Sequence, residues 1–344
     1  MGKGLSRRGA IKAGAASIGA VAGATFTGAE AEAKTDCMSG KDFWDPGPDK
    51  NLKRDLTPGP TTIRIGGFID LKKGPSEAVL DLISQDCTGC VTGPDAINAM
   101  SSSELSEFNA AMKEHDAVVF EVGGYKNMLI PDETKRQANL KDLATALEAA
   151  EKVNCPMVGT CTGSRDPQSY IGVHPDNWTE KTWRLTVDAV KQVLRDTTGL
   201  KAALGIEAQV TMNIDGPKPH RRLMDDVGDK RCAVNLDPVN MCSLATYYHT
   251  TELITECFDL LGETILGAHA KDTYIFPDQQ TVHTQEVCAG RGVMDYETYL
   301  VQLSRLKWPR TLLPEHVPGD QLIEARKYIR KVAEKVGVKI HGDA

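Results

Sequence analysis

Short apolar runs alternate with longer amphipathic segments between about residues 60 and 336 of this 344-residue chain. A run of roughly four to eight mostly apolar residues is typical of a strand that is buried on both faces of a parallel sheet. Segments with apolar residues at helical spacing, such as Leu140, Leu143 and Leu147, predict amphipathic helices. The regular alternation of the two patterns therefore predicts an α/β fold with a parallel sheet.

The alternation gives eight strand–helix units. The predicted strands cover residues 62–68, 90–91, 117–121, 156–160, 202–207, a run ending at 237, a run ending at 269, and 311–315. The predicted helices cover residues 76–84, 103–114, 132–153, 179–195, a segment starting near 219, 243–261, 296–306 and 320–336. A long loop is predicted from Asp272 to Val293.

Eight such units without a tandem antiparallel run predict a (β/α)8 TIM barrel, a single domain over residues 60–337. Residues 34–59 are rich in Pro, Gly, Asp and Lys and read as an extended lead-in, and residues 338–344 as a C-terminal tail. A doubly wound open sheet is the alternative fold. Against it, no Gly-x-Gly-x-x-Gly follows the first predicted strand.

The first 33 residues are predicted to be a twin-arginine signal peptide. The pair Arg7 and Arg8 is followed by a weakly apolar Ala/Gly-rich stretch over residues 13–27 and by Ala-Glu-Ala cleavage sites over residues 29–33. The alternative is a short basic N-terminus on an amphipathic helix. It is less favoured, because it would not explain why an arginine pair, an apolar stretch and a cleavage site occur in this order. The apolar stretch is too short to span a membrane permanently, so we expect an exported, periplasmic or extracellular protein without a stable membrane anchor.

Composition and charge narrow the range of partners. The chain is 41% apolar and 25% charged, as in ordinary soluble globular proteins, and its formal net charge is −7. It has no cluster of Lys and Arg long enough to follow a phosphate backbone, so nucleic acid is not an expected partner. The nine cysteines favour buried thiols over a metal or redox site, while a disulfide involving Cys37 or the Cys87/Cys90 pair stays open.

The fifth to eighth predicted strands each end in a residue that can bind a metal ion. These residues are Glu207, Asp237, His269 and Glu315. The carboxyl ends of barrel strands meet at one face, so three carboxylates and one imidazole should converge there. Hard oxygen ligands with one imidazole favour a single Mn²⁺, Co²⁺ or Mg²⁺ ion, and Zn²⁺ stays open.

Other polar residues are candidates for the mouth of the barrel. Lys271 follows His269 by two positions and should point the same way, unless it is a surface residue of the next loop. Arg165 follows the fourth strand and could bind a substrate oxygen or pair with a neighbouring acid. His174 is either a substrate-binding or a solvent-exposed loop residue, and Glu121 is either a mouth residue or a helix cap.

Four motifs carry a resemblance to the xylose isomerase-like barrel superfamily of sugar phosphate isomerases and epimerases. They are Val-Asn-Leu-Asp-Pro-Val-Asn at 234–240, Gly-Ala-His-Ala-Lys-Asp at 267–272, Ala-Gly-Arg-Gly-Val-Met-Asp-Tyr at 289–296 and Leu-Leu-Pro-Glu at 312–315. The segments 159–166 and 174–177 resemble exported members. The resemblance covers about residues 60–337 and is more specific for the fold and the metal site than for a substrate.

The resemblance also implies roles. In ketose 3-epimerases of this superfamily, a Glu, an Asp, a His and a Glu bind one metal ion, and the two Glu residues transfer protons. By position, this makes Glu207 and Glu315 the catalytic pair. A substrate-binding His follows the metal-binding Asp by three positions in those enzymes, and here the position is Asn240. Pro314, inside the last strand, is a second departure.

Three functions are compatible with the sequence. The first is a metal-dependent isomerase or epimerase that acts on a small carbohydrate through an enediolate. The second is a 3-keto-glycoside lyase that uses the same site for β-elimination, and the third is a non-catalytic periplasmic sugar-binding protein. Apurinic endonucleases share the barrel, but they need further histidines from the second and third strands, which the predicted strand ends lack. The sugar, and whether the chain forms a homo-oligomer, stay open.

The export prediction can be tested in cells. Changing Arg7 and Arg8 together to Lys should leave an uncleaved precursor in the cytoplasm, because the twin-arginine pathway requires the pair. Fractionation followed by immunoblotting would measure this, with the unaltered chain as control. Unchanged accumulation of a processed protein in the periplasm would contradict the prediction.

Overall fold

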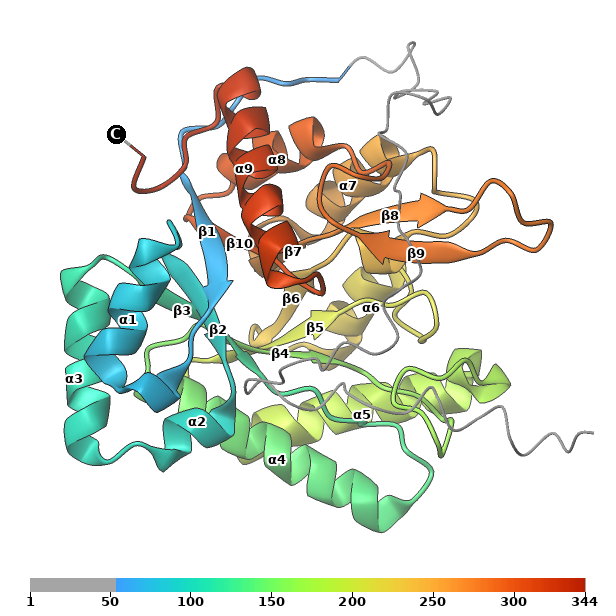
Figure 1. Cartoon of the computed structure of the whole chain (residues 1–344). Helices are drawn as coiled ribbons and strands as arrows, with labels where there is room; N and C mark the ends of the chain where they lie inside the picture. The colour runs from blue at the N-terminus through green and yellow to red at the C-terminus, as the bar shows by residue number, and fades with distance from the viewer. Residues whose placement is uncertain (1–53, 344) are drawn as a thin grey trace, which may run out of the picture.

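Eight parallel strands close into a barrel in the computed structural model, which describes residues 54–343 (Figure 1). The order around the barrel is β1-β10-β7-β6-β5-β4-β3-β2, and each neighbouring pair is parallel. The strands are β1 (Ile63–Phe68), β2 (Gly89–Thr92), β3 (Val118–Gly123), β4 (Met157–Cys161), β5 (Ala203–Glu207), β6 (Cys232–Leu236), β7 (Ile265–Ala270) and β10 (Arg310–Pro314). The predicted TIM barrel is confirmed, with all eight predicted strands present.

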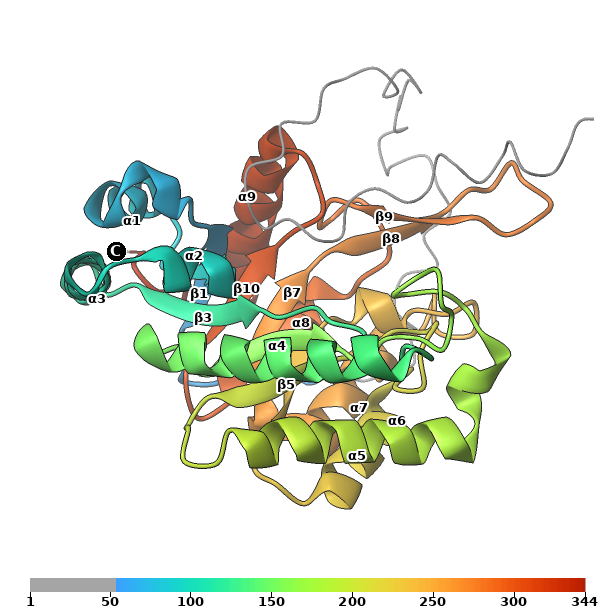
Figure 2. The ribbon, with the colours of Figure 1, turned by 90° about the horizontal axis from the view of Figure 1, so that it is seen from below.

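Helices cover the outside of the barrel and connect successive strands (Figures 1 and 2). They are α1 (Pro75–Ser84), α2 (Pro94–Ala99), α3 (Ser102–Glu114), α4 (Glu133–Lys152), α5 (Glu180–Asp196), α6 (Pro217–Val227), α7 (Thr250–Leu261), α8 (Tyr296–Arg305) and α9 (Gly319–Val336). Helix α7 begins at Thr250 rather than at residue 243, because the preceding residues form turns in which Thr246 N–H donates to the Ser243 carbonyl. Helix α2, which the pattern does not predict, starts at Pro94 after Gly93.

The prediction of a loop from Asp272 to Val293 is wrong in part. This segment contains an antiparallel hairpin, formed by β8 (Asp272–Ile275) and β9 (Thr284–Val287), that pairs only with itself. Its strands are polar at most positions and lack the apolar run of a barrel strand, so the pattern did not reveal them. The hairpin leaves the barrel directly after β7 and projects beyond it in both ribbon views (Figures 1 and 2).

Two irregularities in strand pairing set which side chains face the barrel interior. Cys90 pairs with Val119, but the next residue, Val91, pairs with Glu121, so Phe120 is skipped. A bulge of this kind turns two successive side chains to one side. Phe120 packs inside the barrel, and Glu121 also points inward. In the same way, Leu266 in β7 has no partner residue on β6. The side chains after it alternate between the two faces of the strand, and His269 points inward.

Gly159 on β4 makes room for the Glu121 carboxylate. A Cβ atom at this position would lie 2.2 Å from Glu121 Oε1 and 2.6 Å from its Cδ. The carboxylate cannot move aside freely, because its oxygens accept hydrogen bonds from Asn235 and Tyr125. The absence of a side chain at 159 is therefore part of how the barrel accommodates a buried carboxylate.

Both ends of the described chain pack against the barrel. Arg54 pairs with Asp295, and Ile340 forms a bridge with Ile63, so residues 338–340 extend the packed domain rather than trail from it. The cysteines from Cys87 to Cys288 are free thiols and all but Cys242 are buried, whereas Cys37 and the predicted signal peptide lie outside the described residues. None of the helices in residues 54–343 is long and apolar enough to cross a membrane.

Replacing Gly159 by Ala should destabilise the protein by about 1–3 kcal/mol, the usual cost of inserting a methyl group into a packed interior. Thermal unfolding followed by circular dichroism would measure the loss. Gly216→Ala is the matched control, because a Cβ atom there meets nothing within 4 Å and the backbone is extended. Equal melting temperatures for the two variants would show that Glu121 is not held against Gly159.

Candidate metal centre

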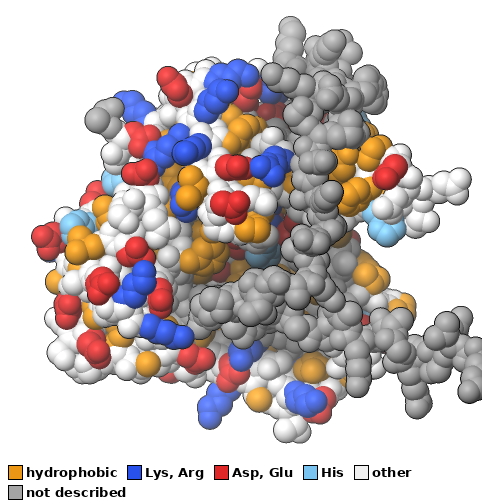
Figure 3. Space-filling model, in the orientation of Figure 1, with side chains coloured by type: hydrophobic (Ala, Val, Ile, Leu, Met, Phe, Trp, Pro, Cys, Tyr) orange, Lys and Arg blue, Asp and Glu red, His pale blue; other side chains and the backbone are white. Residues whose placement is uncertain are grey.

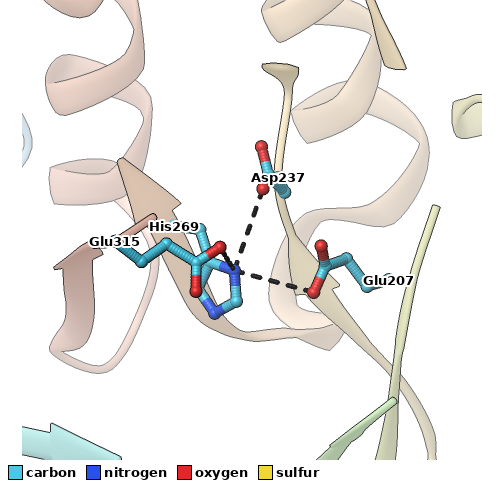
Figure 4. A group of neighbouring side chains, drawn as sticks. All are labelled: Glu207, Asp237, His269 and Glu315. Atoms are coloured by element: carbon cyan, nitrogen blue, oxygen red, sulfur yellow. Dashed lines mark ion pairs between the residues drawn. The ribbon is translucent and has the colours of Figure 1, made fainter. Parts of the chain in front are cut away.

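Four side chains converge at the carboxyl ends of four consecutive barrel strands (Figure 4). They are Glu207 at the end of β5, Asp237 after β6, His269 in β7 and Glu315 after β10. One ligand atom from each residue lies within 4.8 Å of the others. The structure thus brings together the four residues that the sequence predicts as ligands.

His269 Nδ1 lies between the three carboxylates. It is 3.1 Å from Glu315 Oε1, 3.6 Å from Glu207 Oε2 and 3.8 Å from Asp237 Oδ2. All four side chains are buried, with the most accessible residue, Glu315, only 8% exposed. Buried carboxylates are costly unless a positive charge or hydrogen bonds compensate them, so this arrangement strongly favours a bound cation.

A second group of residues fixes the orientation of the His269 ring. Glu121 Oε2 lies 2.9 Å from His269 Nε2, and Asn235 Nδ2 donates to the same carboxylate oxygen at 3.0 Å. Because Glu121 accepts the proton of Nε2, Nδ1 is left to face the centre. A carboxylate behind a metal-binding histidine is a common way to fix the tautomer and the direction of the ring.

Tyr125 links this second group to Glu207. Its hydroxyl oxygen lies 3.0 Å from both Glu121 Oε1 and Glu207 Oε2. A hydroxyl carries one proton and can donate it to only one of the two carboxyl groups. Both contacts are satisfied when Glu207 is protonated and donates to the Tyr125 oxygen while Tyr125 donates to Glu121.

The pKa values of Glu207 and Glu315 are shifted in opposite directions by their surroundings. Burial raises the pKa of Glu207 to about 7, and His269 offsets this only in part. Burial also raises the pKa of Glu315, but the nearby His269 and Lys271 outweigh it and hold the pKa well below its usual range. At neutral pH, Glu315 is therefore ionised, whereas Glu207 is close to its midpoint.

Lys271 and Asn240 reach the centre from the mouth side. Lys271 is 2% exposed, and its Nζ lies 2.6 Å from Asp237 Oδ2 and 3.1 Å from Glu315 Oε1. Burial lowers the pKa of Lys271, but Asp237 and Glu315 outweigh it and raise the pKa well above its usual value, so the side chain is charged. Asn240, in the 3-10 turn η3 (Val239–Met241), donates to Glu207 Oε1 and accepts from Lys271 Nζ at 3.2 Å.

Two other predicted substrate-binding residues lie in the loop after β4 and form no hydrogen bond or ion pair with the four ligands in the described structure. Arg165 donates from Nη1 to the Leu129 carbonyl at 2.7 Å and thereby ties this loop to the one after β3. His174 Nδ1 accepts from the Asp176 amide and caps the 3-10 turn η2 (Pro175–Trp178). These hydrogen bonds of both residues lie within the loops, and the role of the two residues in substrate binding stays a prediction.

Four residues around the centre were not assigned to it from the sequence, although Glu121 was considered for the mouth. They are Glu121, Tyr125, Asn235 and Glu286. The sequence carries a signal for two of them: Glu121 interrupts an apolar strand, and Asn235 precedes Asp237 by two positions and so shares its face. Tyr125 follows its strand without any pattern, and Glu286 lies in the segment predicted as a loop.

The donor set fits one divalent cation. Asp237 Oδ2 and His269 Nδ1 are buried without a hydrogen-bond partner in the described structure, although Lys271 lies close enough to Asp237 Oδ2 for an ion pair. His269 Nδ1 likewise has only ion-pair contacts with the three carboxylates, so the polar contacts of both atoms stay within one centre. Three carboxylates and one imidazole suit Mn²⁺, Co²⁺ or Mg²⁺ by ligand type, and Zn²⁺ by its tolerance of mixed donors.

Comparison with known proteins identifies the barrel. Residues 86–332 match the family described as xylose isomerase-like TIM barrel. No protein of curated function matches the sequence significantly. Similar solved structures include a xylose isomerase-like TIM barrel protein from Mycobacterium smegmatis in complex with magnesium, which is 14% identical, with a TM-score of 0.57 over 80% of this chain and 98% of that one.

Two further structures carry different activities on the same fold. The 3-keto-D-glucoside 4-epimerase YcjR from E. coli is 14% identical, with a TM-score of 0.54 over 78% of this chain and 100% of that one. Endonuclease IV from Thermus thermophilus is 16% identical, with a TM-score of 0.59 over 79% of this chain and 98% of that one. Structural similarity at this low sequence identity shows only that the fold is shared. The reaction must be inferred from the residues of the site.

Binding of a divalent cation should release protons and weaken as the pH falls. Burial lowers the pKa of His269, but Glu315 and Glu207 outweigh it and raise the pKa well above its usual value. At pH 6 both His269 and Glu207 therefore hold protons that a cation must displace, and the affinity should fall about tenfold per pH unit for each displaced proton.

Calorimetric titration of Mn²⁺ at pH 6 and pH 8, in buffers of different ionisation enthalpy, would measure both quantities. The number of protons released per bound Mn²⁺ should be smaller at pH 8, because Glu207 is mostly ionised there before the cation binds. The comparison of the two pH values therefore serves as an internal control. Equal affinity at the two pH values, with no dependence on the buffer, would contradict this account of the site.

Proposed function

The chain belongs to the xylose isomerase-like TIM barrel family, and we propose that it is a divalent-metal-dependent enzyme that moves a proton next to the carbonyl group of a small sugar. The reaction is an isomerisation or epimerisation through an enediolate. The observation that carries the proposal is the placement of two carboxyl groups, Glu207 and Glu315, on either side of His269.

The two glutamates are arranged for proton transfer from two sides. Strands β10, β7, β6 and β5 are consecutive in the barrel, so Glu315 and Glu207 are separated by the two strands that carry His269 and Asp237. A substrate over the centre would present one face to each glutamate. One carboxylate can then remove a proton while the other returns one to the opposite face.

Their opposite pKa shifts support distinct roles. Glu315, whose pKa is held low, is ionised and suits the base that removes the proton. Before a cation binds, burial raises the pKa of Glu207 to about 7, so Glu207 takes up a proton more readily than Glu315 and suits the acid that returns one. Asn240 and Lys271 offer an amide and an ammonium group on the mouth side, where they would bind substrate oxygens.

Glu207, Asp237, His269 and Glu315 would hold the cation. When bound, it would polarise the carbonyl oxygen and the neighbouring hydroxyl oxygen of the substrate and so acidify the C–H bond between the two groups. Glu121 and Asn235 keep the His269 ring in place during this step, and the buried surroundings exclude bulk water from the glutamates.

A second candidate is β-elimination from a 3-keto-glycoside, and the buried ammonium of Lys271 favours it. Glu315 would remove the C2 proton beside the C3 carbonyl, the electron pair would form the C1–C2 double bond, and the C1–O bond would break. The departing oxygen would take a proton from Lys271 Nζ, which lies 3.1 Å from Glu315 Oε1. A similar fold in a 3-keto-D-glucoside 4-epimerase supports a 3-keto sugar as substrate for either reaction.

The proposed substrate is a small carbohydrate met outside the cytoplasm. Export is inferred from the twin-arginine pattern of residues 1–33, which favours an unphosphorylated sugar or glycoside. Figure 3 shows basic and acidic side chains interspersed on one face of the described residues, without a continuous basic track for nucleic acid.

The proposal is tested by incubating Mn²⁺-loaded protein in D₂O with a 3-keto-glucoside and, separately, with a free ketohexose, followed by NMR. Deuterium next to the carbonyl together with a new epimer or isomer is the expected result. Release of the aglycone with an unsaturated keto sugar would identify elimination. Binding of sugar without exchange would instead indicate a non-catalytic sugar-binding protein.

Glu315→Gln should lower turnover about 10²–10⁴-fold at saturating Mn²⁺, because an oxygen ligand remains but the base is lost. The same NMR assay measures exchange and turnover, and Glu148→Gln on the exposed side of α4 is the control for a lost carboxylate. A Glu315→Gln protein that binds Mn²⁺ and exchanges at the normal rate would show that another group, such as Lys271, handles the proton.

A further inference from the structure

The β8–β9 hairpin returns one of its side chains to the metal centre. Glu286, on β9, lies opposite Thr273 of β8 in the hairpin register. Its Oε1 is 2.9 Å from Lys271 Nζ, although 35% of the Glu286 side-chain surface remains exposed at the mouth. The hairpin thus supplies a carboxylate to the one buried cationic side chain that, among the described residues, reaches the ligands from the mouth side.

The hairpin is anchored on both sides, so Glu286 is held where it is. The Tyr247 hydroxyl accepts a hydrogen bond from the Ile275 amide at 3.0 Å, which ties β8 to the loop after β6. Buried Asp272 accepts from the amides of Thr273, Gly290 and Met294 at 2.9–3.0 Å, which fixes the start of the hairpin against the turn that follows it.

His316 holds the Glu286 carboxylate from the other side. His316 Nδ1 lies 3.0 Å from Glu286 Oε2 and 3.4 Å from Lys271 Nζ. The residue has a left-handed backbone with φ 59°, a conformation that a non-glycine residue keeps only where its surroundings enforce it. Burial raises the pKa of Glu286, but the His316 hydrogen bond and the Lys271 charge outweigh it and lower the pKa to about 2.

Lys271 touches two atoms that a cation needs. Its Nζ lies 2.6 Å from Asp237 Oδ2 and 3.1 Å from Glu315 Oε1, and both residues belong to the group that could hold a metal ion. A divalent cation on these oxygens would repel an ammonium group at that distance. Lys271 has only 1% of its side-chain surface exposed, so it cannot simply turn into solvent and needs another partner.

We propose that Glu286 is a positioning residue for Lys271: together with Asn240 Oδ1, it holds the ammonium at the mouth when a divalent cation takes Asp237 and Glu315. This inference rests on the proposed function, in that it requires the four residues to bind a cation. It does not depend on which sugar reaction follows.

The test is calorimetric titration of Mn²⁺ at pH 7.5 into four full-chain proteins: the parent, Glu286→Gln, Lys271→Met and the double variant. Glu286→Gln should weaken Mn²⁺ binding on the order of tenfold, because the ammonium then competes more strongly for Asp237 and Glu315. Lys271→Met should bind Mn²⁺ at least as tightly as the parent. In the Lys271→Met background, Glu286→Gln should have almost no effect.

Two controls separate this coupling from simpler effects. Asp278→Asn removes one negative charge from the exposed end of the same hairpin and should leave Mn²⁺ affinity unchanged. Glu286→Asp restores the charge on a shorter side chain and should recover part of the affinity. Thermal melting of each variant would verify that the barrel is folded.

The outcomes distinguish this inference from the proposed function. A parent protein that binds no Mn²⁺ would overturn both. A parent that binds Mn²⁺, with Glu286→Gln equally tight, would overturn only the role of Glu286. Equal weakening by Glu286→Gln with and without Lys271 would also overturn it, because the effect would then be direct attraction between Glu286 and the cation.

Discussion

Several carboxyl groups are buried together at the ends of four barrel strands, and the protonation and contacts of the other groups in the site depend on their negative charge. Three carboxyl groups surround His269 Nδ1, and a fourth, Glu121, lies behind the ring. The barrel holds this charge with one imidazole, one ammonium and a few hydrogen bonds, so the protonation of each group depends on all the others. The shifts of Glu207 and Glu315 in opposite directions follow from their different distances to the two basic groups.

The barrel backbone makes this arrangement possible. The bulge at Phe120 turns Glu121 inward beside an apolar side chain, and the missing side chain at Gly159 provides its space. The skip at Leu266 brings His269 and then Lys271 to the interior. Two local departures from regular pairing therefore decide which polar groups meet, while the remaining pairs keep the barrel closed.

Much of this could be predicted from the sequence, because it depends on strand periodicity. The four candidate ligands and Lys271 follow from the position of each strand end and from the alternation of side chains along a strand. Glu121 could be predicted only in part: a carboxylate that interrupts an apolar strand is a signal, but the bulge that turns it inward leaves no mark in the sequence. Arg165, after β4, donates to the Leu129 carbonyl, and its contact with a substrate stays a prediction. Glu286 was missed because a polar hairpin has the same composition as a loop.

The hairpin pairs only with itself, and this has an evolutionary consequence. Residues inserted at or removed from its tip, between Ile275 and Thr284, shift no barrel strand against its neighbours. The strand ends that hold the four ligands and the element that stands over the mouth can therefore vary independently. A lineage could lengthen or shorten this arm, or change its charge, and so alter access to the centre while the four buried side chains stay in place.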